Sequence, residues 1–80
     1  MNAKIYKVNN LARVKDLIAK DNATLKDFGD ELQYDTAYVS GCIYAGDYIV
    51  LHEGKIITVI DGSTPEDVLP FSISEVQVRN

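Results

Sequence analysis

The spacing of apolar residues in the first quarter of the chain predicts a strand followed by a helix. Residues 4–8 combine β-branched and aromatic side chains, which is typical of a short strand. Asn9 and Asn10 are of a helix-capping residue type, and residues 11–20 carry apolar side chains at helical spacing. These apolar positions are Leu11, Val14, Leu17 and Ile18.

Residues 24–32 carry a second helical pattern. Thr24 is a good N-cap, and Asp27 three residues later comes close to a capping box. Gly29 would weaken this helix by up to about 1 kcal/mol relative to Ala. The apolar positions on one face of the predicted helix are Leu25, Phe28 and Leu32.

The rest of the chain predicts an irregular stretch and then strands. Residues 33–46 show no regular period, whereas residues 48–52 and 55–60 form a hairpin pattern around Glu53-Gly54. Two further elements are expected, a helix start at residues 64–69 that Pro70 ends and a bulged last strand at residues 71–78. We expect the core to include Leu17, Phe28, Leu32, Ile49 and Leu51.

The composition is that of one soluble globular domain. The chain has 80 residues, 46% of them hydrophobic and 25% charged, which are ordinary values. The formal net charge is -4, and this argues against nucleic acid as a partner because phosphate binding depends on clustered Lys and Arg. Residues 27–80 hold ten of the twelve acidic residues.

The beginning of the chain lacks the apolar segment of a signal peptide, and no apolar run reaches the roughly 20 residues that span a bilayer. We therefore expect a cytoplasmic protein without membrane contact. A place in the cell wall or spore envelope would also be compatible if the chain belongs to a longer protein.

Candidate catalytic and metal-ligating residues are few. Cys42 and His52 are the single cysteine and histidine, too few for a disulfide or for a tetrahedral metal site. Their spacing does not show a nucleophile and base pair, and Cys42 is more typical of a small buried side chain. Carboxylates gather on the polar face of the second predicted helix: Asp27, Asp30, Glu31 and Asp35. We expect no enzymatic activity and no cofactor.

Tyrosines cluster in and beside the irregular stretch. Tyr34, Tyr38, Tyr44 and Tyr48 fall within a short segment, and exposed aromatic faces flanked by polar groups are what a sugar-binding loop requires. The alternative is that Tyr44 and Tyr48 pack in the core.

Three segments resemble the lysin motif (LysM) family. Tyr6-Lys7-Val8 matches its opening Tyr-x-Val, residues 22–28 resemble the start of its second helix, and residues 43–49 resemble its closing Ile-Tyr-x-Gly-Gln-x-Leu. The resemblance covers residues 4–52 and implies a strand, two helices and a closing strand. Residues 55–69 would then be a partial, decayed second copy.

In that family, N-acetylglucosamine oligomers of peptidoglycan or chitin bind between the strand-to-helix loop and the loop before the last strand. The resemblance therefore implies five ligand-binding residues: Asn10, Arg13, Tyr34, Tyr38 and Tyr44. The family's Gly-Asp-Thr is replaced by residues 11–13 here, so the resemblance supports the fold better than the ligand.

Together these observations predict a single α+β domain, with a LysM-like β-α-α-β core at residues 4–52 and a C-terminal β extension at residues 53–80. The expected function is a non-enzymatic module that binds a cell-wall or spore-envelope glycan. The alternative is a small acidic protein-interaction module, such as a regulator or a phage-type inhibitor. A β-grasp carrier is a third option, although the chain lacks the C-terminal Gly-Gly of such carriers.

Overall fold

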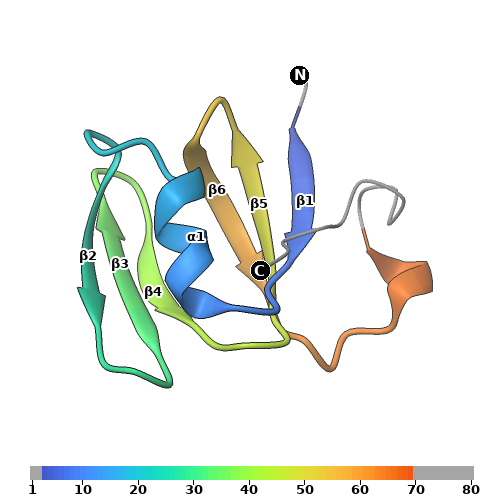
Figure 1. The fold of residues 1–80 in the computed structure, drawn as a ribbon. Coiled ribbons are helices and arrows are strands. Elements are labelled where there is room, and N and C mark those ends of the chain that lie inside the picture. Colours follow the sequence, from blue (N-terminus) through green and yellow to red (C-terminus); the bar gives the residue numbers. More distant parts are fainter. Residues whose placement is uncertain (1–2, 70–80) are drawn as a thin grey trace.

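The computed structural model describes residues 3–69, which form two three-stranded antiparallel sheets with a short helix between them (Figure 1). The elements in chain order are β1 (Lys4–Lys7), α1 (Leu11–Leu17), β2 (Ala23–Asp27), β3 (Leu32–Thr36), β4 (Ser40–Ile43), β5 (Tyr48–His52), β6 (Lys55–Ile60) and the 3-10 helix η1 (Glu66–Val68). Sheet A has the order β1-β5-β6, and sheet B has the order β2-β3-β4.

The main hydrophobic core joins both sheets and the helix. Val14 and Ile18 from the α1 segment pack with inward side chains of both sheets. Sheet B contributes Leu32, Tyr34 and Ile43, and sheet A contributes Ile49, Leu51 and Ile56. Burial of apolar surface from three directions is therefore what holds the two sheets together.

Helix α1 begins as predicted but ends early. The Asn10 side-chain oxygen accepts a hydrogen bond from the Ala12 N–H at 3.0 Å, so Asn10 is the N-cap. The helix ends at Leu17 because Ile18 is extended, and the Ala19 N–H then donates to the Gly54 carbonyl at 2.9 Å. The segment after the helix is thus hydrogen-bonded to the β5–β6 turn.

Sheet A confirms the predicted first strand and the predicted hairpin. Ile5 lies opposite Val50 in the β1–β5 pairing, and Glu53-Gly54 forms the β5–β6 turn with positive φ at both residues. A second hydrophobic cluster forms on the face of sheet A opposite the main core. Its buried members are Ile5, Tyr48 and Val50, with Ala3, Ile57, Ile60 and Leu69 packed against them.

The prediction of a LysM-like β-α-α-β core at residues 4–52 is wrong, because residues 24–32 do not form a helix. They form β2, a turn and the start of β3, and the stretch predicted as irregular contains the rest of β3 and β4. The turn residue Gly29 has φ 92°, which an L side chain rarely adopts. Antiparallel pairing of β2 with β3 places Leu25 and Leu32 on the core face, where Leu32 is buried and Leu25 partly buried, and this outweighs their helical spacing.

This difference changes the predicted core. Phe28 is 57% exposed, whereas Leu32, Ile49 and Leu51 are buried as predicted. Leu17 is half-buried and packs against the main core. The helix start near residue 64 is confirmed only as the single turn η1. Its predicted end at Pro70 and the strand predicted at residues 71–78 lie outside the described residues.

Candidate functional site

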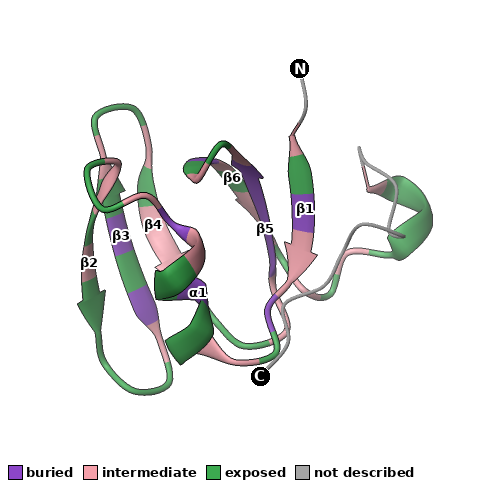
Figure 2. Cartoon of the chain, turned by 45° about the horizontal axis from the view of Figure 1, so that its top comes forward, coloured by how far each residue is buried: buried purple, intermediate pink, exposed green. Residues whose placement is uncertain are grey.

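The face of sheet B that points away from the core carries polar side chains from all three strands. Along β3, Leu32 and Tyr34 are buried while Gln33 and Asp35 are exposed, and Figure 2 shows this alternation. The strand register places the outward side chains in rows. One row is Thr24, Asp35 and Ser40, and the next is Lys26, Gln33 and Cys42.

A third row continues the sheet beyond the paired residues of β2, β3 and β4. The Phe28 N–H donates to the Glu31 carbonyl at 2.9 Å, which extends the β2–β3 ladder by one pair. The Tyr44 hydroxyl donates to Oε2 of Glu31 at 3.1 Å. Strand alternation puts Phe28, Glu31 and Tyr44 on the same face as the two polar rows. We call these three rows the outer face of sheet B.

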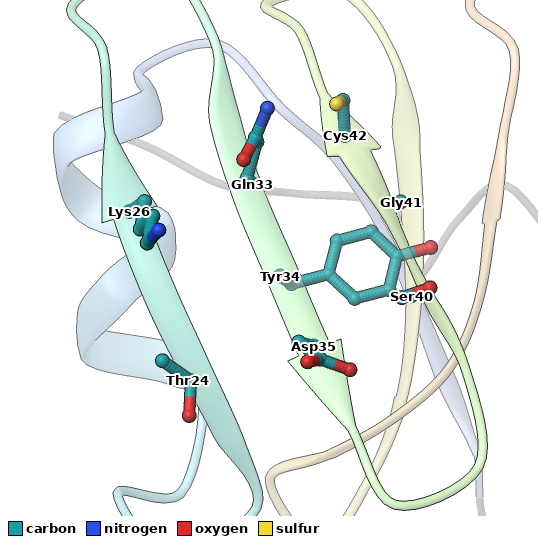
Figure 3. Close-up of a pocket in the computed structure, with 8 residues that line it drawn as sticks. All are labelled: Thr24, Lys26, Gln33, Tyr34, Asp35, Ser40, Gly41 and Cys42. Carbon is teal, nitrogen blue, oxygen red and sulfur yellow. The ribbon is translucent and has the colours of Figure 1, made fainter.

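The outer face combines exposed aromatic rings with hydroxyl, ammonium, amide and carboxylate groups. Phe28 and Tyr44 are 57% and 49% exposed and lie on either side of Glu31. A pocket of about 390 Å³ lies over the two polar rows, and Figure 3 shows the side chains that line it. Its polar lining consists of Thr24, Lys26, Gln33, Asp35 and Ser40, with Cys42 beside them, and the sequence-predicted Tyr34 and its neighbour Gly41 also line it.

Tyr34 and Gly41 form a close cross-strand pair under this pocket. Gly41 lies opposite Tyr34 in the register, and a Cβ on Gly41 would stand 2.9 Å from the Tyr34 hydroxyl oxygen. Tyr34 is 7% exposed, and burial raises the pKa of its phenol. The glycine therefore leaves room for a buried ring, and the ring packs in the main core rather than toward solvent.

Glu31 is the electrostatic centre of the third row. Its hydrogen bond with the Tyr44 hydroxyl raises the pKa of that phenol. The pKa of the Cys42 thiol is raised as well, chiefly by hydrogen bonding to Glu31 and to a smaller extent by burial. Because both shifts favour the protonated forms, Cys42 is a thiol rather than a reactive thiolate at neutral pH. Cys42 lies in sheet B and His52 in sheet A, so the fold does not pair them.

The five sequence-predicted site residues are not brought into one site. Asn10 caps α1, Arg13 is exposed on that helix, and Tyr34 is buried in the core. Tyr38 is 94% exposed in the β3–β4 turn, where its N–H donates to the Thr36 hydroxyl at 3.1 Å. Of the five, only Tyr44 lies on the outer face of sheet B.

A second pocket of about 390 Å³ lies where α1 begins, next to the β2–β3 turn. Asn10 is the one sequence-predicted residue that lines it, together with Asp27, Asp30 and Ala45 among others. The Asp27 carboxylate is already engaged there, because it forms an ion pair with Lys15 at 2.9 Å.

Sequence reasoning missed most of the outer face of sheet B. Lys26, Phe28, Glu31 and Gln33 were placed on a helix or in an irregular stretch. Two signals identify them in retrospect: the Gly29-Asp30 pair, which is a two-residue hairpin turn type, and the alternation of apolar and polar residues in 32–36.

Comparison with protein-family models, with curated proteins and with solved structures found no match to this chain. Within residues 3–69, no three metal-ligating side chains come together, and neither helix has the length and apolarity to cross a membrane.

Proposed function

We propose that this protein is a non-enzymatic binding module that binds a glycan on the outer face of sheet B. The observation that carries the proposal is the row of Phe28, Glu31 and Tyr44, in which two exposed rings flank a carboxylate beside two polar rows. The apolar C–H faces of a pyranose stack on such rings, while polar neighbours bind its hydroxyl groups.

The dimensions of the face suit a short oligosaccharide. Neighbouring strands lie about 4.8 Å apart, and successive outward side chains on one strand lie about 6.8 Å apart. Three rows across three strands therefore cover a surface of about 10 by 14 Å. A sugar stacked on the aromatic row would place its neighbour over Lys26 and Gln33.

The polar groups match the mixed chemistry of sugars. Hydroxyl and acetamido groups both donate and accept hydrogen bonds. Lys26 donates, Asp35 and Glu31 accept, and the amide of Gln33 does both. This set favours a neutral glycan of the N-acetylglucosamine type. An anionic ligand would lie near the Glu31 and Asp35 carboxylates, and a cationic ligand would lie near Lys26.

Titration with N-acetylglucosamine oligomers, followed by amide chemical shifts, tests the proposal. We expect shifts in residues 24–44 and a dissociation constant on the order of 1 mM to 1 μM, as shallow sites give. Phe28→Ala should abolish most of the shift changes. Tyr38→Ala is the matched control, since Tyr38 is more exposed but lies at the other end of β3. Unchanged spectra at millimolar ligand would refute glycan binding.

A second candidate function is protein interaction. It is favoured by the edges of sheet B: among the described strands, none pairs with the outer side of β2 or β4. Such edges can accept an added strand from a partner. Pull-downs with insoluble peptidoglycan and chitin, set against a lysate pull-down, distinguish the two functions. A discrete protein retained from lysate, with no retention on either glycan, would favour this candidate.

A further inference from the structure

Resting on the glycan-binding function proposed above, we infer that Glu31 is the specificity-determining residue of the outer face of sheet B. It accepts a hydrogen bond from one hydroxyl of the sugar that stacks on Phe28 and Tyr44. Tyr44 then has two roles, since its ring forms part of the stacking surface and its hydroxyl positions the Glu31 carboxylate.

The first argument is that Glu31 is fixed from both sides. Its backbone carbonyl accepts the Phe28 N–H at 2.9 Å, and its carboxylate oxygen Oε2 accepts the Tyr44 hydroxyl at 3.1 Å. A long surface carboxylate normally samples several rotamers and loses that freedom when it binds. Here the Tyr44 hydroxyl holds the carboxylate before any ligand arrives, and the Phe28 N–H fixes the backbone from which that side chain extends.

The second argument is the remaining hydrogen-bonding capacity of the carboxylate. A carboxylate has about four acceptor positions, and the Tyr44 hydroxyl occupies one of them. Within residues 3–69, no Lys, Arg or His side chain forms an ion pair with Glu31. The unused positions are open to a further donor, and a sugar hydroxyl lying over the two rings supplies one.

The third argument concerns discrimination. A site built to bind a hydroxyl rejects an analogue without it, because the acceptor is left desolvated and without a partner. Glu31 is half-buried, so the discrimination is smaller than in an enclosed site. We expect about tenfold weaker binding of the analogue that lacks the hydroxyl facing Glu31.

One experiment tests the pair in the free protein. The hydrogen bond to Glu31 raises the pKa of Tyr44, so Glu31→Gln should lower that pKa, measured by NMR titration of the ring carbons. Asp35→Asn is the matched control, because it removes a carboxylate two rows away on the same face. A Tyr44 pKa that is unchanged by Glu31→Gln would overturn the inference.

A second experiment tests discrimination with ligand. The probes are tri-N-acetylglucosamine and a set of its monodeoxy analogues. The natural protein should lose about tenfold in affinity for one analogue, and both Glu31→Ala, which removes the acceptor, and Tyr44→Phe, which removes its positioning bond, should erase that difference. Tyr38→Phe, in the β3–β4 turn, is the control that should preserve it.

The outcomes separate this inference from the proposed function. Phe28→Ala should weaken the binding of every analogue by a similar factor, because it removes stacking alone. If the natural protein binds and Glu31→Ala still discriminates among the analogues, the specificity role is refuted while glycan binding stands. If the natural protein binds none of the probes, glycan binding is refuted and this inference with it.

Discussion

The two sheets have the same number of strands but differ in how many faces they bury. In sheet A, β5 is buried continuously from Tyr48 to Leu51 (Figure 2). Hydrophobic clusters lie on both faces of this sheet. In sheet B, β3 alternates buried and exposed residues, and only one face contacts the core. A sheet that is buried on both faces contributes mainly stability, whereas a sheet that is buried on one face also offers its other face to a ligand.

The composition of the strands accounts for this division. β5 reads Tyr-Ile-Val-Leu, a continuous apolar run, whereas β3 reads Leu-Gln-Tyr-Asp-Thr. Substitutions on the outer face of sheet B should therefore change binding with little effect on folding. Substitutions of buried residues in sheet A should instead lower stability and have little direct effect on binding.

The largest effect is expected from a chain that ends at His52. This truncation removes β6, the partner of β5, but leaves every strand of sheet B in place. It exposes buried side chains of β5, and the loss should exceed the roughly 5–15 kcal/mol of a typical domain's stability. Thermal unfolding followed by circular dichroism should show no cooperative transition. A transition at the full-length midpoint would mean that sheet B and β1–β5 suffice.

A point substitution in sheet A should cost several kcal/mol. Ile49 is fully buried between the sheets, so Ile49→Ala should lower the free energy of unfolding by about 2–5 kcal/mol. Gln33→Ala on the outer face of sheet B is the matched control and should stay within about 0.5 kcal/mol. Urea unfolding measures both. Equal losses would abolish the distinction between the sheets.

A smaller loss is expected where sheet B packs on the core. In Gly41→Ala, the new Cβ would meet the Tyr34 ring, and displacing that ring should cost about 1–3 kcal/mol. In a Tyr34→Phe background, the closest clash is removed and the same substitution should cost less. A double-mutant cycle by urea unfolding checks this coupling. Additive losses would show that the ring does not lie against Gly41.

The smallest effect concerns the ion pair between α1 and sheet B. The pKa of Asp27 is lowered chiefly by the hydrogen bond from Lys15 and, to a smaller extent, by the hydrogen bond from the Gly29 N–H. A lowered folded-state pKa adds stability above the ordinary carboxylate pKa, and this stability is lost as pH falls through the lowered value.

Asp27→Asn should therefore flatten the acid side of a plot of urea midpoint against pH, and salt should weaken the difference because the pair is exposed. Asp16→Asn, on the exposed side of α1, is the matched control. An identical acid slope in the natural protein and Asp27→Asn would contradict this ion pair.

The sequence predicted sheet A well because its signals are local. The apolar run in residues 48–51, the Glu53-Gly54 turn and the return strand together form a hairpin pattern. The N-cap at Asn10 was equally direct.

Sheet B could not be predicted in the same way, because Leu25, Phe28 and Leu32 fit a helix face as well as two strands. The choice depends on long-range packing: β3 places Leu32 and Tyr34 against residues of sheet A. The error carried over to the site, since an incorrect helix put Glu31 on a solvated face and Phe28 in the core. Tyr44 was identified because its aromatic character does not depend on the element that carries it.

The position of β1 in sheet A has a consequence for the order of folding. The pairings β2–β3, β3–β4 and β5–β6 join neighbouring strands and need only short turns, so they can form within microseconds. Pairing of Lys7 with Tyr48 has to close a loop that contains α1 and the whole of sheet B. That closure lowers the chain entropy before the contacts between β1 and β5 can compensate for the loss. We therefore expect β1 to dock after the other strands, so that its burial adds more to the barrier against unfolding than to the rate of folding.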